Sequence, residues 1–314
     1  MRILVVGAGG IGGYFGGRLL EAGRDVTFLV RPRRAAQLAR TGLAIRSPHG
    51  DVDIARPPML TADTIAHRFD LVLLSCKAYD LDGAIGSFAQ AVGPSTLILP
   101  LLNGLRHLDV LEARFGSRVL GGLCATSAAL DADGRIVHFN DLDALSFGER
   151  GGGRSARVEA VASAFAGARF ASRLSEAILQ EMWEKWVFIA SAAGINCSMR
   201  APIGDIVAAG GRDLATALLD ECAAIAARQG FVPSAAAINR TRAMLTAPGS
   251  PFIASMLRDI ERRAPIEADH IVGDLLSRGE DSGVATPLLR IVYVHLKAYE
   301  ARRSRELPSA VAVS

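Results

Sequence analysis

The sequence has few aromatic residues, no excess of one charge sign and no long apolar segment. Aromatic side chains make up 6% of the 314 residues, whereas half of the residues are apolar and 32 are glycine. This composition is typical of helices packed closely on a sheet. With 35 basic and 32 acidic side chains, the charge balance gives no support for nucleic acid as a partner. No run of about 18 uninterrupted apolar residues is present to cross a membrane.

Cysteine and histidine are sparse and scattered. Cys76, Cys124, Cys197 and Cys222 lie far apart in apolar surroundings without CxxC spacing, and the six histidines form no local cluster. We therefore expect reduced thiols and no metal site. No basic-then-apolar leader precedes the first expected strand, so we expect a cytoplasmic protein.

Residues 1–31 predict a strand, a glycine turn, a helix and a second strand. The turn consists of Gly7, Ala8, Gly9, Gly10, Ile11 and Gly12. Its first, third and sixth residues follow the GxGxxG spacing, in which glycine serves a sharp turn, close approach of backbone to a pyrophosphate, and tight contact between helix and strand. Amide groups at the helix start then face the anion, so we expect a bound dinucleotide rather than a ligand-free turn.

The end of the second strand distinguishes between nicotinamide cofactors. NAD sites usually place a carboxylate there for the ribose 2′-hydroxyl, whereas this chain has Arg31, Arg33 and Arg34. A guanidinium pairs with a 2′-phosphate through charge-assisted hydrogen bonds, and a carboxylate would repel it. We therefore expect NADPH or NADP, with these arginines near the phosphate. The alternative is that the three arginines form only a solvated loop.

The pattern up to residue 171 alternates strands with helices. Two short β segments within residues 43–54 predict an inserted hairpin, and later buried strands end before Lys77 and Asn103. This alternation predicts an α/β fold with a parallel, doubly wound sheet of the Rossmann type, whose ligands lie beyond the carboxyl ends of the strands. The glycine turn, Arg31, Lys77 and Asn103 all follow such ends, so we expect them at one site.

From residue 172 the pattern predicts helices only. A chain of this length accommodates two domains, which we place at residues 1–171 and 172–314. The first helix of the second domain, expected from Leu174 to about Ala193, carries Lys185 among apolar neighbours. Half-burial would disfavour the charge of this amine and suit it to proton transfer. The competing interpretation is a lysine that extends to the surface.

The longest helical pattern runs from Ser255 to about Leu276 and is interrupted at Pro265, which kinks the helix or begins a new turn. Ser255 and Glu267 are twelve residues apart, so on a near-regular helix they share a face. A final helix is expected from Pro287, and the residues after Glu306 should fray.

Together these features resemble the ketopantoate reductases (2-dehydropantoate 2-reductases) over nearly the full length of the chain. The resemblance lies in the glycine turn, Cys76-Lys77-Ala78, Asn103-Gly104, Trp183-Glu184-Lys185, Ser255-Met256-Leu257 with Asp259, and Ile266-Glu267-Ala268-Asp269. This family joins an NADPH-binding Rossmann domain to an all-helical domain like that of 6-phosphogluconate dehydrogenase. Its reaction is the reduction of ketopantoate to pantoate in pantothenate biosynthesis, with catalysis between the two domains.

The resemblance implies which residues bind the cofactor. Beside the glycine turn, Arg31 would face the 2′-phosphate and Lys77 would lie along the cofactor. Asn103 and Ala128 would lie near its nicotinamide end, where Asn103 would also reach the substrate. Glu267 would position the cofactor or a substrate hydroxyl.

The resemblance also implies the catalytic residues. Lys185 would act as general acid, giving a proton or a hydrogen bond to the 2-oxo oxygen of a small 2-oxo acid, with Glu267 beside it. Ser255 would hold the substrate carboxylate. Charge develops on the carbonyl oxygen in the transition state, and a positioned cation stabilises it more than the neutral ketone.

One departure from the family concerns the substrate. Members that reduce ketopantoate usually carry asparagine four and eight residues after the lysine, where this chain has Ile189 and Ala193. Asn196 shares the helix face but lies about 16 Å from the lysine along the axis, too far to replace them. The loss should weaken ketopantoate binding by roughly 0.5 to 1.5 kcal/mol for each hydrogen bond.

Three functions therefore stay open. The first is an NADPH-dependent ketopantoate reductase, and the second is a reductase of the same family for a more apolar 2-oxo acid or ketone that fits Ile189 and Ala193. The third is a non-catalytic NADPH-binding module. Lys185 argues against the third, because a binding module gains little from a half-buried amine. The apolar helical domain is compatible with a homodimer.

Overall fold

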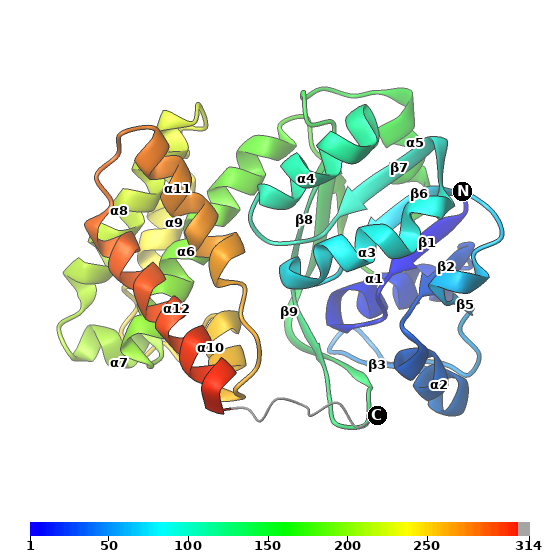
Figure 1. Cartoon of the computed structure of the whole chain (residues 1–314), viewed down its shortest axis with the longest axis horizontal. Coiled ribbons are helices and arrows are strands. Elements are labelled where there is room, and N and C mark those ends of the chain that lie inside the picture. Colours follow the sequence, from blue (N-terminus) through cyan, green and yellow to red (C-terminus); the bar gives the residue numbers. More distant parts are fainter. Residues whose placement is uncertain (307–314) are drawn as a thin grey trace. The chain divides into compact units, whose positions relative to one another are not determined.

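The computed structural model describes residues 1–306 and divides the chain into two compact units after Met182 (Figure 1). The division lies later than the predicted boundary between residues 171 and 172. The reason is a short strand, β10 (Ser172–Leu174), which pairs in parallel with β9 and so keeps this segment in the first unit. The expectation that only helices follow residue 172 is therefore wrong.

The first unit contains a five-stranded parallel sheet in the order β5-β2-β1-β6-β7. Its strands are β1 (Ile3–Val6), β2 (Val26–Leu29), β5 (Met59–Leu60), β6 (Phe69–Leu74) and β7 (Val92–Pro100). β1 is central and pairs in register with β2 on one side and β6 on the other. The strand order reverses direction at β1, so the crevice beyond its carboxyl end is the switch point at which such sheets bind ligands. The predicted Rossmann-type sheet is confirmed.

Five α-helices surround the strands of this unit. They are α1 (Gly10–Glu21), α2 (Pro32–Thr41), α3 (Leu81–Phe88), α4 (Arg106–Phe115) and α5 (Ala156–Phe165). Alternate side chains of β1 point to opposite faces of the sheet, and Ile3 and Val5 join the apolar core that α1 and α5 cover. Leu4 and Val6 face the other side and are also buried. A sheet covered on both faces reads as continuous apolar runs, which is why its strands were evident in the sequence.

A second sheet lies in the same unit, and the sequence pattern did not separate it from the first. Its strands follow the order β10-β9-β3-β4, with β8 pairing β9. They are β3 (Leu43–Arg46), β4 (Val52–Ile54), β8 (Gly121–Leu130), β9 (Ile136–Gly148) and β10. The predicted hairpin is β3 and β4, which are antiparallel. β3 also pairs in parallel with β9, a partner about 90 residues later that local periodicity does not reveal.

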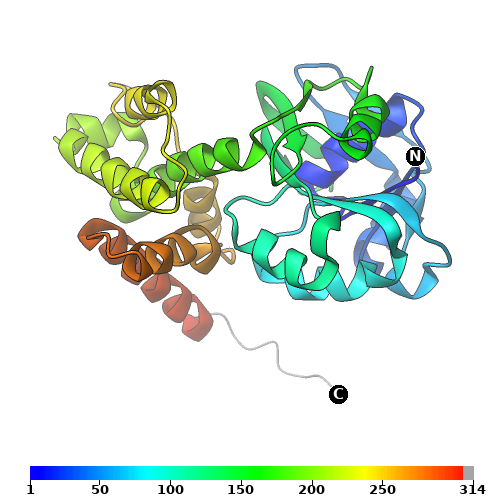
Figure 2. The same ribbon diagram turned by 90° about the horizontal axis from the view of Figure 1, so that it is seen from above.

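The described part of the second unit is built from helices, as Figure 2 shows. α6 (Ile178–Met199) starts in the first unit and continues into this one. The other α-helices are α7 (Ile203–Ala208), α8 (Arg212–Arg228), α9 (Ala235–Leu245), α10 (Ser255–Glu261), α11 (Asp274–Asp281) and α12 (Pro287–Glu306), with a π-helical turn, η5 (Asp269–Gly273), before α11. The fraying expected after Glu306 lies outside the described residues.

Helix ends in this unit follow from local sequence. Gly230, with φ of 89°, closes the end of α8 in the left-handed conformation that glycine adopts without strain. The hydroxyl of Ser234 accepts a hydrogen bond from the amide of Ala237 and so caps the start of α9. The carboxylate of Glu221 accepts hydrogen bonds from the amides of Leu288 and Leu289 at the start of α12.

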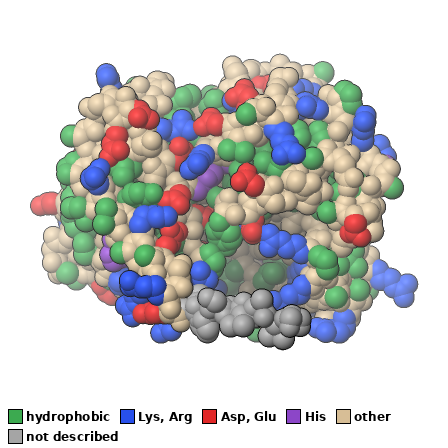
Figure 3. Space-filling view, in the orientation of Figure 1, with side chains coloured by type: hydrophobic (Ala, Val, Ile, Leu, Met, Phe, Trp, Pro, Cys, Tyr) green, Lys and Arg blue, Asp and Glu red, His purple; other side chains and the backbone are tan. Residues whose placement is uncertain are grey.

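The surface carries charges of both signs. On the face shown in Figure 3, basic and acidic side chains are interspersed, in agreement with the near balance of charges in the sequence. Among the described residues, no helix combines the length and the apolar character needed to span a membrane.

Candidate functional site

The glycine turn has the geometry that its spacing predicted. Gly7 has φ of 95°, a conformation that side chains rarely adopt. A Cβ added to Gly12 would lie 2.0 Å from the Oγ of Ser75, so only glycine permits the contact between α1 and the residue that follows β6. A Cβ added to Gly9 would meet no atom within 4 Å. The backbone at Gly9 is therefore open to a ligand at the N-terminus of α1, where first-turn amides favour an anion.

Ser75 holds this turn in place, and the sequence analysis missed its role. Its Oγ lies 2.9 Å from the carbonyl oxygen of Val6 and 3.3 Å from that of Gly7, so its hydroxyl donates to the end of β1. The signal was present in the sequence, because Ser75 is the first polar residue after the apolar strand β6.

Ala128 lies against the start of α1. A Cβ added to Gly10 would be 2.2 Å from the carbonyl oxygen of Ala128, so β8 crosses closely over the first residue of the helix. This close approach places Ala128 beside the glycine turn, and it gives Gly10 a packing reason that the GxGxxG spacing does not contain.

Lys77 and Asn103 follow the neighbouring strands β6 and β7. Because β1, β6 and β7 are adjacent and parallel, the segments after them emerge at the same edge of the sheet as the glycine turn. The side chain of Lys77 is exposed, and Asn103 is half-buried. The structure thus brings both segments to the switch point, as the sequence pattern predicted.

Arg31 lies at the N-cap of α2, directly beyond β2, and forms an ion pair with Asp80. Its Nη2 is 2.7 Å from Oδ1 of Asp80, and its side chain is 73% exposed. This hydrogen bond raises the pKa of the Arg31 guanidinium. Exposed ion pairs contribute only about 0 to 1 kcal/mol, so Arg31 can exchange Asp80 for a ligand anion at little cost.

Arg34 is a second basic residue at this position, and the sequence analysis did not single it out. Its Nε donates to the carbonyl oxygen of Ala8 at 3.1 Å, and its Nη1 donates to Gln37 at 2.7 Å and to the carbonyl of Gly134 at 3.0 Å. Burial lowers the pKa of this guanidinium. Its Nη2 is buried without a hydrogen-bond partner among the described residues, although buried donors are normally paired.

These features fit a dinucleotide. Gly9 offers an open backbone beside the helix N-terminus, while Arg31 and Arg34 lie beyond the adjacent strand with hydrogen-bonding capacity for an anion. The residues present thus provide places for a pyrophosphate and for a further phosphate group.

In the second unit, Lys185 lies on α6 between two buried tryptophans. Trp183 is 3% exposed and Trp186 is fully buried, whereas Lys185 is half-buried. The predicted half-burial of Lys185 is confirmed. The helix itself runs from Ile178 to Met199 rather than from Leu174 to about Ala193, because β10 occupies its expected start.

Two hydrogen bonds from α6 hold the segments that carry Ser255 and Glu267. The Oδ1 of Asn196 accepts from the amide of Ala254, directly before Ser255, at 2.9 Å. The indole Nε1 of Trp186 donates to the carbonyl of Ile271 at 2.9 Å, in the π-helical turn after Glu267. The segments of all three predicted residues are therefore connected through one helix.

The near-regular helix on which Ser255 and Glu267 would share a face does not form. α10 ends at Glu261, and the chain is non-helical at Glu267, which precedes η5. Pro265 has no amide hydrogen to donate and disfavours helix in the residue before it, so it ends the helix instead of kinking it. Ser255 is exposed at the first residue of α10, and Glu267 is half-buried.

The cysteines are free thiols. Burial raises the pKa of Cys197 and of Cys222 to about 12, so both stay protonated and unreactive at neutral pH. Among the described residues, no group of three or more histidine, cysteine or acidic side chains is arranged to hold a metal ion.

A glycine turn at the switch point of a parallel sheet, followed by a helical unit with a half-buried lysine, is typical of a nicotinamide-dependent oxidoreductase. Comparison with known proteins gives the family. Ketopantoate reductase PanE/ApbA matches residues 3–152, and its C-terminal domain matches residues 177–300. The chain therefore belongs to the ketopantoate reductase family, which confirms the resemblance found in the sequence.

Individual proteins show the extent of the similarity. The uncharacterized oxidoreductase YkpB of Bacillus subtilis is 39% identical over 96% of this chain and 100% of its own length. The structure of 2-dehydropantoate 2-reductase from Methylococcus capsulatus has a TM-score of 0.87 at 28% identity, covering 98% of this chain and 99% of that one. D-mandelate dehydrogenase with NADH and anilino(oxo)acetate has a TM-score of 0.86 at 21% identity, covering 97% and 100%, and shares the fold.

Proposed function

We propose that the protein catalyses the NADPH-dependent reduction of a 2-oxo acid, with ketopantoate as the first candidate substrate and pantothenate biosynthesis as its role. Family membership supports the class of reaction. The observation that carries the proposal is Lys185, a half-buried amine in an apolar stretch of α6. A homodimer stays a prediction.

The first unit would hold the cofactor, which supplies the hydride when bound. The amides around Gly9 would bind its pyrophosphate. Arg31 would exchange Asp80 for the 2′-phosphate, and the unpaired Nη2 of Arg34 would give this phosphate a second donor. Lys77, Asn103 and Ala128 are the proposed contacts farther along the cofactor.

The second unit would bind and protonate the substrate. Lys185 would donate its proton to the 2-oxo oxygen, so that the carbonyl becomes the hydroxyl of a 2-hydroxy acid. The hydroxyl of Ser255 would bind the substrate carboxylate, and Glu267 would accept a hydrogen bond from a substrate or cofactor hydroxyl. The bonds from Trp186 and Asn196 support this proposal, because they tie both segments to α6.

A second candidate is the reduction of a more apolar 2-oxo acid. Ile189, one helical turn after Lys185, is half-buried, and Ala193 is 4% exposed. Neither side chain can hydrogen-bond the 4-hydroxyl or carboxylate of ketopantoate. A branched aliphatic or aromatic substituent would fit the same surface without leaving a polar group unpaired.

A substrate panel tests both candidates. Ketopantoate, 2-oxoisovalerate, which lacks the hydroxymethyl group, and the aromatic acid benzoylformate are each mixed with the protein and NADPH, and loss of absorbance at the nicotinamide band is followed. Highest kcat/KM for ketopantoate supports the first candidate, and highest kcat/KM for either apolar acid supports the second. Absence of turnover on every acid at millimolar concentration would contradict both.

A further inference from the structure

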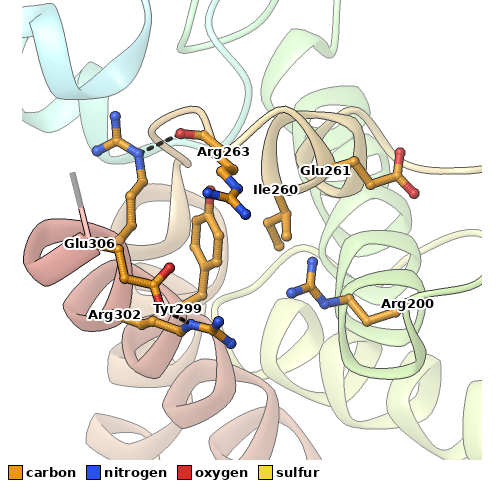
Figure 4. A pocket seen from close by; sticks show the side chains of 8 residues that line it. Arg200, Ile260, Glu261, Arg263, Tyr299, Arg302 and Glu306 are labelled. Carbon is orange, nitrogen blue, oxygen red and sulfur yellow. Dashed lines mark hydrogen bonds and ion pairs between the residues drawn. The ribbon is translucent and has the colours of Figure 1, made fainter.

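A pocket of about 260 Å³ lies in the helical unit, where three helices end (Figure 4). Its walls come from the residue after α6, from the end of α10 with the turn that follows, and from the last turns of α12. The lining residues are Arg200, Ile260, Glu261, Arg263, Tyr299, Arg302, Arg303 and Glu306. None of them belongs to the candidate site described above.

The lining is predominantly basic. Four guanidinium groups face two carboxylates, and Arg302 is paired with Glu306 at 2.5 Å. This pair leaves the guanidinium groups of Arg200, Arg263 and Arg303 against the single carboxylate of Glu261 in the lining. Figure 4 shows Glu261 directing its carboxylate away from Tyr299. The pocket therefore holds positive charge that its own side chains leave uncompensated.

Backbone conformation gives a second, independent observation. Arg200 and Arg263, with φ of 54° and 55°, are the two non-glycine residues of the described chain in the left-handed region. Arg200 is the first residue after α6 and Arg263 the second after α10. At such helix ends the chain elsewhere uses glycine, as at Gly23, Gly230 and Gly283. Glycine, which has no Cβ, would adopt this conformation without strain at both positions. Arginine stands at both of these positions on the walls of one pocket, and backbone strain of this kind clusters at ligand sites.

Contacts around Tyr299 hold the guanidinium groups in place. The Cζ of Arg200 lies 6.0 Å from the centre of the Tyr299 ring, within the range of a cation–π interaction. The Tyr299 hydroxyl donates to the carbonyl of Ala264 at 2.8 Å, and Nε of Arg303 donates to the carbonyl of Arg263 at 2.8 Å. The last contact uses Nε alone, so the terminal nitrogens of Arg303 remain as donors for a ligand.

We propose that this pocket binds the diphosphate end of a phosphorylated small molecule. Arginine side chains bind phosphate oxygens in paired hydrogen bonds, and several converging guanidinium groups favour a ligand of more than one negative charge. Sites for whole drug-sized ligands usually measure about 300 to 1,000 Å³. The smaller volume here suits a diphosphate group, with the attached part of the ligand outside.

Calorimetric titration of the full-length protein with inorganic pyrophosphate tests the proposal. Excess NADP is present, so that the glycine turn is not available to the probe. Arg263→Gln should weaken pyrophosphate binding about tenfold or more, because one charge-assisted contact is lost. Arg262→Gln is the matched control, since Arg262 is exposed beside the pocket and does not line it, and it should change binding less than about twofold. Equal binding by the Arg263→Gln variant and the control would overturn the proposal.

The variant Arg263→Gly distinguishes the contribution of the Arg263 side chain to ligand binding from its effect on the stability of the fold. Without pyrophosphate this variant should melt about 1 to 3 °C higher than the natural chain, because glycine relieves the left-handed strain. The natural chain should gain thermal stability from pyrophosphate, and the variant should lose that gain. If sodium chloride at equal ionic strength raised the melting temperature of the natural chain as much as pyrophosphate does, the proposal of specific binding would be overturned. Tighter binding of citrate than of pyrophosphate would overturn the assignment to a phosphorylated ligand.

Discussion

The two units position their candidate site residues in different ways. In the first unit, the glycine turn, Lys77 and Asn103 directly follow adjacent parallel strands, so their order along the chain fixes their place at the sheet edge. In the second unit, Ser255 and Glu267 lie on separate segments that hydrogen bonds join to α6. The bonded residues are 58 and 85 positions apart in the sequence. The strand pattern therefore predicts which residues meet at strand ends, whereas a site on a helical scaffold depends on which distant segments pack together.

The largest expected effect lies in the second unit. Lys185→Met removes the amine but keeps an unbranched stem, so the fold should persist. If Lys185 is the general acid, kcat should fall by about 10² to 10⁴-fold, and NADPH affinity should stay within about twofold, because the cofactor is assigned to the first unit. Steady-state kinetics and fluorescence titration measure the two quantities. An active Met variant would remove the lysine from this role.

The variants Gly12→Ala and Gly9→Ala compare two roles of glycine in the turn, which are close packing at residue 12 and access for a ligand at residue 9. A Cβ at residue 12 would collide with Ser75 and with the carbonyl of Gly7, so we expect a loss of about 1 to 3 kcal/mol in the free energy of unfolding, measured in urea. A Cβ at residue 9 meets open space, so stability should be unchanged while NADPH affinity falls at least about tenfold. Equal stability of the two variants would mean that the turn tolerates the collision.

Cofactor choice should depend on two arginines of the first unit. Arg31→Ala and Arg34→Ala should each weaken NADPH binding by about tenfold and leave NADH nearly unchanged, since a charge-assisted contact to the 2′-phosphate is worth about 1.5 to 3 kcal/mol. Arg33→Ala is the control, because Arg33 is exposed between them. If the Arg34 variant loses NADPH and NADH affinity equally, Arg34 does not contact the 2′-phosphate. Its role would then be to hold the glycine turn through its hydrogen bond to Ala8.

Asn196 tests the long-range support of the second unit. Its amide donates to the carbonyl of Ala201 and accepts from the amide of Ala254, and Asn196→Leu would leave both groups unpaired. We expect a loss of about 2 to 4 kcal/mol in the free energy of unfolding and a raised substrate KM through Ser255. Ser198→Ala on the same helix is the control, since its hydroxyl has no partner among the described residues. An unchanged KM in the Asn196 variant would mean that Asn196 does not position Ser255 for substrate binding.

The smallest effect concerns pH and lies in the first unit. A hydrogen bond from Arg157 lowers the pKa of Glu149 below its usual value of 4.5, against the effect of burial. Folding thus favours the charged carboxylate, and this stabilisation is present above about pH 4.5 and is lost as the pH falls through the lowered pKa. Glu149→Gln should cost about 1 kcal/mol at pH 7, and this cost should shrink progressively as the pH falls below about 4.5, measured by urea unfolding. A pH-independent difference would mean that the charge is not involved.

The sequence by itself determined the parts of this protein that obey local rules. Apolar runs fixed the buried strands, and the glycine spacing fixed the turn, because φ at Gly7 and the contact at Gly12 exclude other residues. The lone lysine in an apolar helix was also evident, since a charged residue in such a stretch is costly wherever it is half-buried.

Only the tertiary structure decided what depends on residues far apart in the chain. Pro265 was visible in the sequence, but whether it kinked or ended the helix depended on what packed there, and so did the relation of Ser255 to Glu267. The second sheet depends on pairing between β3 and β9, which are far apart in the sequence. The burial of Nη2 of Arg34 and the basic pocket at the end of α12 likewise depend on contacts between distant segments. Periodicity reports which side of an element is apolar, but it carries no information on which distant partner that element meets.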